Sequence, residues 1–475
     1  MLMIFYRYYG QSLPPREKDQ TQAEWLQYLN NRQALADIPS FAADFSRDEC
    51  PEEDLTPKGT PWVMIGGSYS GMRAAFSRNE YPDTIFAAFA SSSPVQAKLD
   101  MAVYLEQVYR GMVANGYQSC ATDLHAAMTW IDSQLAQNGI AGDKVKQLFL
   151  GPGAENNSNG DFTAALGYIY GTFQAYGMAG GDLGLGALCD WIEQSPPVIH
   201  RRHVGNQTLT STNQTLTRAN HTLTSANQTL TRANQTMTSA NQTVVIPKVA
   251  PPSGLAPYVS AKAVAERFAA WPQLAALVNS YSGQNCLGTD PTQPTSCNLG
   301  LPLDDPDAIS WTWQYCSQWG FFQRDNAGPH GLMSVFQTLA YNQEFCYRQF
   351  PDAVDAGLLP ASPDVHGINA ETGGWHIRPS NTYWSGGEFD PWRPLSPLST
   401  ETFVPVSVNV HQTVPRCGQR TTVHDIFGYV MPNAMHCFDF NMQFPPGAIS
   451  RRYFTTALMT WLPCFEKKMA KRWTA

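Results

Sequence analysis

The chain has 475 residues, 43% of them hydrophobic and 12% aromatic, which is enough for one large domain with an insertion or for two to three average domains. Only 15% of the residues are charged and the net charge is −8, so no basic excess exists to meet phosphates, and we predict no nucleic-acid partner. Because no stretch of about 20 apolar residues occurs, we also predict no membrane span.

The N-terminal stretch MLMIFYRYYG has six apolar or aromatic residues before Arg7. It is too short for the core of a signal peptide and lacks a small-residue cleavage site, so we predict no signal peptide in this chain and a strand that begins in mid-fold. Residues 21–45 follow, with apolar side chains at helical spacing, and this pattern predicts a helix.

The stretch WVMIGGSYSGMRAAF, residues 62–76, joins an apolar run to a helical pattern through two glycines. We predict a buried strand up to the glycines, a helix over 71–80, and a second apolar strand over 84–95. Strand, helix and strand with continuously apolar strands are typical of a parallel sheet covered on both faces. The fold class predicted from this pattern is therefore α/β.

Within this stretch, Ser68 stands at the centre of a G-x-S-x-S pattern. Gly66 precedes it by two positions, and Ser70 follows by two with Gly71 beside it. The nucleophile of an α/β-hydrolase sits on a tight strand-to-helix turn that demands small residues at these positions. Ser70 fits worse as the nucleophile because Met72 would then occupy a small-residue position. A glycine turn without catalysis is the alternative interpretation.

Residues 206–243 repeat the unit NQTLTSA or NQTLTRA with a period of seven. Each unit has one large apolar residue where a coiled-coil seam needs two, so we predict a disordered surface loop over 205–245. The Asn-x-Ser/Thr sequons predict glycosylation if the chain enters the secretory pathway. They begin at Asn156, Asn206, Asn213, Asn220, Asn227, Asn234 and Asn241.

Ten cysteines are scattered along the chain without a CxxC pair. This spacing argues against a zinc site, and we predict no metal and no other cofactor. An even, scattered set in a large chain favours structural disulfides in an oxidising compartment. Unpaired buried thiols are the alternative.

A nucleophilic serine needs a base and an orienting acid, which follow it in the order Ser, Asp, His in α/β-hydrolases. Asp390 comes after a glycine-rich turn in WSGGEFDPWRP, and His436 lies in the short segment PNAMHCFDF. The alternatives are an ordinary Asp-Pro turn and a structural histidine. The rival pair His424–Asp425 lies inside TTVHDIFGYV, which is typical of a strand.

Segments from nearly the whole chain carry a family resemblance, and only the 206–243 repeat is foreign to it. The chain resembles the serine peptidase family of lysosomal prolylcarboxypeptidase, dipeptidyl peptidase II, thymus-specific serine protease and the fungal acid prolyl endopeptidases, and is most similar to the fungal members. The segments are RYYGQSLP (7–14), LQYLNNRQALADIPSFA (26–42), GGSYSGMRAAFSRNEYPDTIFAAFASSSPV (66–95), YSGQNC (281–286), WQYCSQWGFFQ (313–323), GGEFDPW (386–392) and MHCFDF (435–440).

The resemblance implies an α/β-hydrolase domain formed by residues 1–99 and 306–475, with a helical cap inserted at 100–305. It also implies a secreted-type serine peptidase that cleaves peptide or protein substrates after proline, in an extracellular, vacuolar or lysosomal location. Ser68 would be the nucleophile, Asp390 the orienting acid and His436 the general base.

Further roles follow from the same resemblance. The backbone N–H of Tyr69 would stabilise the oxyanion. Met72, Trp392 and Phe321 stand where the family's proline-pocket residues stand, although ordinary core packing would explain apolar residues there equally well. The implied disulfides are Cys316–Cys346 and Cys189–Cys286.

The chain departs from the family at its N-terminus. Members start with a signal peptide and several strands that include a GNEG-type turn, which resembles the second element of the oxyanion hole. We therefore expect a truncated or degenerate copy that lacks one sheet edge and one oxyanion donor, a loss of about 3 kcal/mol in the barrier. The alternatives are a catalytically inactive, glycosylated surface or binding protein on a peptidase scaffold, and another α/β-hydrolase chemistry such as ester hydrolysis.

Overall fold

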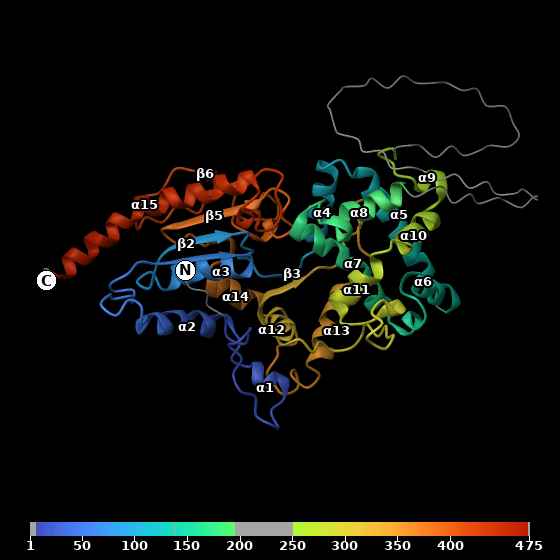
Figure 1. Cartoon of the computed structure of the whole chain (residues 1–475), viewed down its shortest axis with the longest axis horizontal. Coiled ribbons are helices and arrows are strands. Elements are labelled where there is room, and N and C mark those ends of the chain that lie inside the picture. Colours follow the sequence, from blue (N-terminus) through green and yellow to red (C-terminus); the bar gives the residue numbers. More distant parts are fainter. Residues whose placement is uncertain (1–5, 138, 195–249, 474–475) are drawn as a thin grey trace, which may run out of the picture.

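A computed structural model describes residues 6–137, 139–194 and 250–473 of the chain (Figure 1). The sequon repeat, with six of the seven predicted glycosylation sites and the predicted loop 205–245, lies outside the described residues. Asn156, the seventh site, is exposed at the end of a short 3-10 turn just before a long helix. Within the described part of the chain, no helix is both long and apolar enough to cross a membrane.

The central element is a five-stranded sheet in which every neighbouring pair is parallel, with the strand order β1-β2-β5-β7-β6. A separate parallel pair joins β3 and β4. The predicted strand at 84–95 is shorter than expected, because its last residues leave the sheet as a turn. The strand bounds are β1 Trp62–Gly67, β2 Ile85–Ser91, β3 Lys98–Asp100, β4 Gly320–Phe322, β5 Thr382–Gly387, β6 Asn409–His411 and β7 Asp425–Met431.

Helices supply the rest of the regular structure. The helix predicted over 21–45 is two helices, since the chain leaves the helical conformation at 27–30. The helix bounds are α1 Gln22–Leu26, α2 Asn31–Ala43, α3 Tyr69–Glu80, α4 Val103–Ala114, α5 Gln118–Leu135, α6 Ile140–Leu150, α7 Asn159–Tyr176, α8 Leu185–Gln194, α9 Ala256–Val259, α10 Ala261–Ala269, α11 Leu274–Ser282, α12 Pro306–Gln314, α13 Leu339–Gln349, α14 Val365–Thr372 and α15 Pro445–Trp473.

The sheet is covered on both faces, α15 lying on one side and α3 on the other (Figure 1). Side chains of a strand alternate between its faces. Phe89 and Phe427 accordingly belong to a buried cluster with Trp461 of α15. Their chain neighbours Ala90 and Ile426 belong to the main core, which includes the buried residues of α3. The predicted parallel sheet with helices on both faces is therefore present.

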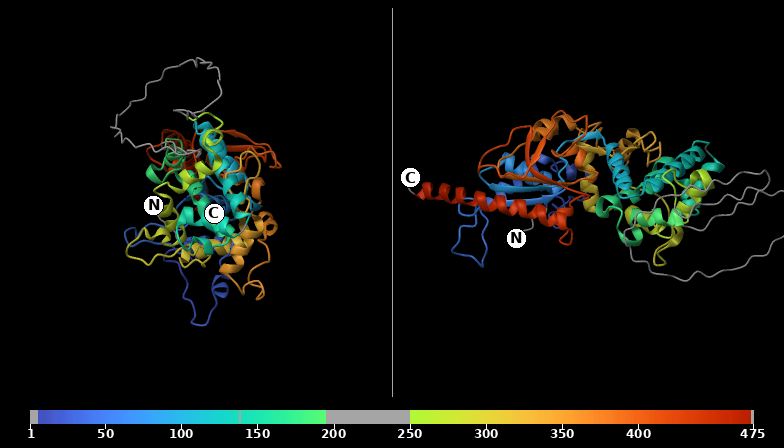
Figure 2. Two further views of the ribbon diagram at one scale, coloured as in Figure 1. Left: turned by 90° about the vertical axis from the view of Figure 1, so that its right-hand side faces the viewer. Right: turned by 90° about the horizontal axis from the view of Figure 1, so that it is seen from above.

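Helices α4 to α11 form a helical region beyond the end of the sheet where the strands terminate (Figures 1 and 2). It contacts the loops that follow β5 and β7. The side-chain amide of Gln107 on α4 donates to the carbonyl oxygen of Glu388 at 3.2 Å, and that of Asn115 donates to the Asn433 side chain at 3.1 Å. The helical region is thus joined to the loops at the carboxyl end of the sheet.

Four disulfides are present among the described residues, and one predicted pairing is wrong. Cys189 does not bond to Cys286, because α8 packs beside α5, and Cys286 lies on a tight loop closed by the bridge between Asn285 and Ser296. Cys50 and Cys437 are free thiols. The disulfides are Cys120–Cys189, Cys286–Cys297, Cys316–Cys346 and Cys417–Cys464.

Candidate active site

Ser68 alone connects β1 to α3, since the strand ends at Gly67 and the helix begins at Tyr69. Its backbone has φ 60° and ψ −129°, a combination that residues with a Cβ adopt rarely. Strained residues of this kind persist where the surrounding structure imposes them, and they are concentrated at functional sites. The same turn geometry exposes the serine of a nucleophile elbow above the sheet.

Close packing explains which positions around Ser68 must be glycine. A Cβ on Gly66 would lie 2.2 Å from the carbonyl oxygen of Ser70, and one on Gly71 would lie 2.3 Å from the Ser93 hydroxyl. Ser70 itself is exposed, so its side chain is tolerated where the common motif has a glycine. The G-x-S-x-S variant therefore keeps the geometry of the elbow, with Gly71 at the crowded position.

Ser68 is held by its backbone hydrogen bonds, and its hydroxyl does not cap the helix. Its amide donates to the carbonyl oxygen of Ser91 at 2.9 Å, which ties the turn to the end of β2. A serine at this position usually caps the helix with its side chain, but here the side chain makes no capping bond. The first amides of α3, including that of Tyr69, have no acceptor within the helix.

Asp390 and His436 come from the loops after β5 and β7, which are neighbours in the sheet. The imidazole Nδ1 of His436 lies 2.8 Å from Oδ1 of Asp390. The same carboxylate oxygen accepts the backbone amide of Trp392 at 2.9 Å, which fixes its orientation. Both side chains are buried, with relative exposures of 7% for His436 and 0% for Asp390. An ionised carboxylate here selects the histidine tautomer with the proton on Nδ1.

The other ring nitrogen of His436, Nε2, is buried and has no hydrogen-bond partner. Burial disfavours the charged imidazolium, but the Asp390 carboxylate and the neighbouring Cys437 together outweigh that effect and raise the pKa of His436. A base with an open nitrogen and a carboxylate that stabilises its protonated form can accept a proton from a hydroxyl.

The loop of His436 packs directly against the turn of Ser68. The amide of Cys437 donates to the Ser92 hydroxyl at 2.9 Å, one residue beyond the partner of the Ser68 amide. A Cβ on Gly67 would lie 2.8 Å from the Cys437 sulfur. Residues next to Ser68 and next to His436 are therefore in contact, so the fold brings the serine and the Asp–His pair to one place.

Asp439 anchors the loop that carries His436. The sequence patterns did not identify this residue. Its carboxylate is fully buried and accepts the hydroxyls of Ser91, at 2.6 Å, and of Ser385. Burial raises the pKa of Asp439. The only local signal was an acidic residue between two aromatic residues, Phe438 and Phe440.

An aromatic cluster adjoins the histidine. The Trp392 ring packs edge-on against Phe321 at 5.2 Å and against Tyr104 at 5.7 Å between ring centroids. The Trp392 centroid is also 6.4 Å from that of His436. Phe321 lies two residues after a π-helical turn and has an uncommon positive φ of 62°. Tyr104, from α4, was not among the predicted residues.

Met72 lies one helical turn after Ser68 and is fully buried. Phe76, one turn further, stacks on Trp319 at 6.1 Å, and Trp319 stacks on Phe321 at 5.9 Å. The three side chains predicted for a proline pocket, Met72, Phe321 and Trp392, thus belong to one buried aromatic and apolar cluster.

The rival pair His424–Asp425 lies at the opposite end of β7 from His436. His424 Nδ1 lies 3.2 Å from the carbonyl oxygen of Ser407, and Asp425 accepts the Thr422 hydroxyl at 2.7 Å. Because β7 runs parallel to β1, the start of β7 lies at the end of the sheet away from the serine turn.

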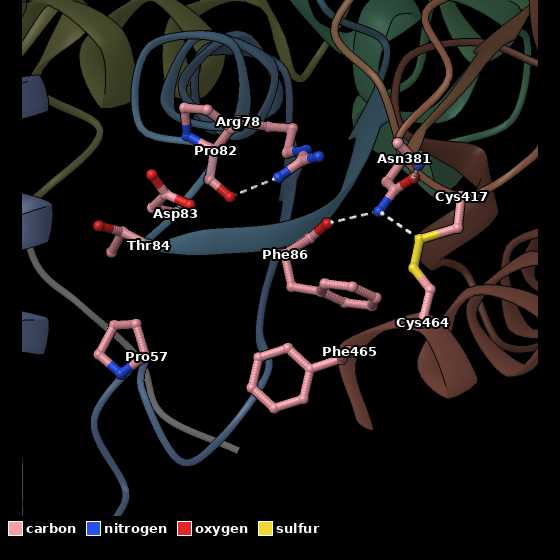
Figure 3. A pocket seen from close by; sticks show the side chains of 11 residues that line it. Pro57, Arg78, Pro82, Asp83, Thr84, Phe86, Asn381, Cys417, Cys464 and Phe465 are labelled. Atoms are coloured by element: carbon pink, nitrogen blue, oxygen red, sulfur yellow. Dashed lines mark hydrogen bonds between the residues drawn. A yellow bond between two sulfur atoms is a disulfide. The ribbon is translucent and has the colours of Figure 1, made fainter. Parts of the chain in front are cut away.

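A pocket of about 220 Å³ also lies at this amino end of the sheet (Figure 3). Asn381 donates to the carbonyl oxygen of Phe86 at 3.0 Å, and Arg78 donates to that of Pro82 at 2.8 Å. The disulfide Cys417–Cys464 closes one side of the pocket. It contains none of the residues predicted for catalysis.

A serine on a strained strand-to-helix turn, served by an Asp–His pair from two later strands of a parallel sheet, is the arrangement of the α/β-hydrolase class. The family model described as serine carboxypeptidase S28 matches residues 1–246 and 272–414. These matches cover most of the chain, which therefore belongs to this family and is a serine-type peptidase.

Relatives whose names state an activity support the same class. The chain is 24% identical to "Thymus-specific serine protease" of Mus musculus, over 99% of this chain and 76% of that protein. It is 23% identical to "Probable extracellular serine carboxypeptidase" of Arthroderma benhamiae, over 94% of this chain and 53% of that protein. A shorter match, 37% identical, covers 20% of this chain and 18% of "Lysosomal Pro-X carboxypeptidase" of Mus musculus. The chain thus spans about half of the fungal relative.

Proposed function

We propose that the protein hydrolyses peptide bonds after proline through an acyl-enzyme, with Ser68 as nucleophile, His436 as general base and Asp390 as the orienting acid. The observation that carries the proposal is the 2.8 Å contact between His436 Nδ1 and Asp390 beside a strained serine turn, with the imidazole Nε2 left without a partner.

In the first half-reaction, Ser68 Oγ attacks the carbonyl carbon of the proline residue while the hydroxyl proton passes to His436 Nε2. The carbonyl π electrons move to the oxygen and form the tetrahedral oxyanion. When the oxyanion collapses, the C–N bond breaks, and His436 returns the proton to the leaving amine. Asp390 stays ionised and stabilises the imidazolium throughout, which agrees with its effect on the pKa of His436.

In the second half-reaction, a water molecule takes the place of the amine. His436 accepts a proton from the water, the hydroxide oxygen attacks the acyl carbon, and the Ser68 oxygen leaves with the proton from the imidazolium. The backbone N–H of Tyr69 donates to the oxyanion in both steps, since the first amides of a helix lack internal acceptors and favour negative charge.

Selectivity for proline follows from the aromatic cluster. The five-membered ring of proline needs apolar walls, and its imide nitrogen has no N–H that would require a partner. Trp392 and Phe321 offer aromatic surfaces next to His436, and Met72 lies one turn from Ser68. We assign these three side chains to the walls of the subsite for proline.

The domain organisation of the chain is also part of the proposal. Residues 1–99 and 306–475 act as the hydrolase domain, and the helices within residues 100–305 act as a cap. The hydrogen bonds from Gln107 and Asn115 to the loops after β5 and β7 support a cap over the reacting groups. Four disulfides and relatives named extracellular or lysosomal support an oxidising compartment outside the cytosol.

Labelling with a fluorophosphonate tests the nucleophile. We expect an adduct on the peptide that contains Ser68, formed as Oγ attacks phosphorus and fluoride leaves, and no adduct in Ser68→Ala. Peptides with proline before the scissile bond should then be cleaved with a higher kcat/KM than simple esters that lack proline. A well-folded protein that takes up no label would instead support the inactive surface-protein alternative.

A further inference from the structure

Gln174, near the end of α7, reaches from the helical region to the aromatic cluster. Its side-chain oxygen Oε1 accepts the indole N–H of Trp392 at 2.7 Å and the hydroxyl of Tyr104 at 3.0 Å. An amide oxygen has two lone pairs, so both bonds can form at once. One atom of the helical region therefore holds two rings of the cluster together.

The main chain of the same residue contacts the catalytic loop. The carbonyl oxygen of Gln174 accepts the backbone amide of His436 at 3.3 Å. The loops that carry Trp392 and His436 follow different strands, and they meet at this one residue of α7.

The contact to Trp392 fixes the rotation of the indole. Trp392 is 9% exposed, and a buried indole N–H without an acceptor is costly, so the ring keeps the orientation that points its N–H at Gln174. In that orientation the ring meets Phe321 edge-on at 5.2 Å. Without the acceptor, the indole would turn to find another partner and the spacing of the two rings would change.

We infer that Gln174 is a positioning residue that sets the selectivity for proline by fixing Trp392 as a wall of the subsite. The inference rests on the proposed function, because it assumes that Trp392 borders the residue before the scissile bond. A rigid wall favours proline, whose ring matches the shape of the subsite, over alanine. Such a preference is modest in an apolar pocket, and it is lost when the pocket relaxes.

The test compares kcat/KM for two peptides that differ only in proline or alanine before the scissile bond. Gln174→Met keeps the length of the side chain and the main-chain bond to His436 but removes the acceptor. We expect the proline-to-alanine ratio to fall about tenfold, the scale of one lost hydrogen bond that had fixed the indole. Gln174→Glu keeps an acceptor oxygen and should retain the ratio, a rescue that loss of packing alone would not produce.

Asn115→Leu is the matched control. It removes another hydrogen bond between the helical region and the loop of His436, to Asn433, without touching Trp392. We expect the ratio to stay at the wild-type value in this variant. A fall as large as that of Gln174→Met would show that any loosening of the interface changes selectivity, and would overturn the assignment of Gln174.

A double-mutant cycle with Trp392→Phe tests whether Gln174 acts on the ratio through the indole N–H of Trp392. If Gln174 acts through the indole N–H, adding Gln174→Met to Trp392→Phe changes the ratio no further. Full additivity would overturn the inference. A wild-type chain without preference for proline would refute the proposed specificity and the role of Gln174 together, whereas a preference that survives Gln174→Met refutes the role of Gln174 alone.

Discussion

Arg78 at one end of the parallel sheet and the Asp390–His436 pair at the other use their buried polar atoms in opposite ways. At the amino end, the guanidinium of Arg78 donates to three main-chain carbonyls and one hydroxyl, from the segments around β2 and β5. At the carboxyl end, Oδ2 of Asp390 and Nε2 of His436 are buried without a partner, and Ser68 has a strained backbone.

The difference teaches where stability and reactivity lie in this molecule. A satisfied buried group adds modestly to stability, whereas each unsatisfied one costs about 1–3 kcal/mol. Arg78 therefore holds segments around β2 and β5 together, whereas the Asp390–His436 pair keeps unused hydrogen-bonding capacity, at some cost in stability. Substitutions at the two ends should accordingly separate effects on turnover from effects on folding.

The largest effect is expected from Asp390→Asn, which should lower kcat about 10⁴-fold because the histidine loses its orienting acid. The carboxylate raises the pKa of His436, so without it the imidazole loses its proton at lower pH. We expect the acidic limb of the kcat/KM profile to move to lower pH.

Unfolding free energy against pH checks the same group in Asp390→Asn. A raised pKa in the folded state adds stability that is fully present below the unfolded value near 6.5 and is lost as pH rises through the folded value. The wild type should show this loss and the variant should not. An acidic limb that stays in place would contradict the assigned pair.

Arg78→Met tests the amino end and should act on folding alone. It leaves several buried carbonyls unpaired, so we expect the free energy of unfolding in urea to fall by about 3 kcal/mol. The folded variant should keep kcat within about threefold. Arg47→Met is the control, since that side chain is exposed and pairs with Glu49, and this variant should unfold at the same urea concentration as the wild type. A large loss of kcat in folded Arg78→Met would break the comparison.

Asp439→Asn should give the smallest effect. It sharpens the comparison because Asp439 lies at the same end of the sheet as Ser68, but its carboxylate has hydrogen-bond partners. We expect a loss of about 1 kcal/mol in unfolding free energy for one impaired hydrogen bond to Ser91 or Ser385. Burial raises the pKa of Asp439, so its contribution is present below the unfolded pKa and is lost as pH rises through the folded one. Unfolding free energy followed with pH should fall less in the variant than in the wild type.

Sequence patterns predicted those structural features that depend on residues close together in the sequence. The turn at Ser68 was predicted because its small residues lie within six positions, and the parallel sheet because its strands are continuously apolar. The order Ser, Asp, His and the family resemblance pointed to Asp390 and His436, which the structure places in contact. Their catalytic roles stay predictions until turnover is measured.

Long-range contacts account for what was missed. The bond from Trp392 to Gln174 spans 218 positions and that from Ser91 to Asp439 spans 348. No local spacing encodes such pairs. The pairing of Cys189 with Cys286 failed for a related reason, since the packing of α5 against α8 decides the partner of Cys189.

The hydrogen bond between Ser92 and Cys437 joins residues 345 positions apart, and this separation has a consequence during synthesis. Ribosomes add about 5–20 residues per second, so roughly 20–70 s pass between the two ends of that bond. During this interval β1, the serine turn and β2 exist without the loop that carries His436. With the roles proposed for Ser68 and His436, the nascent chain would lack its general base during this interval and would not yet be an active peptidase.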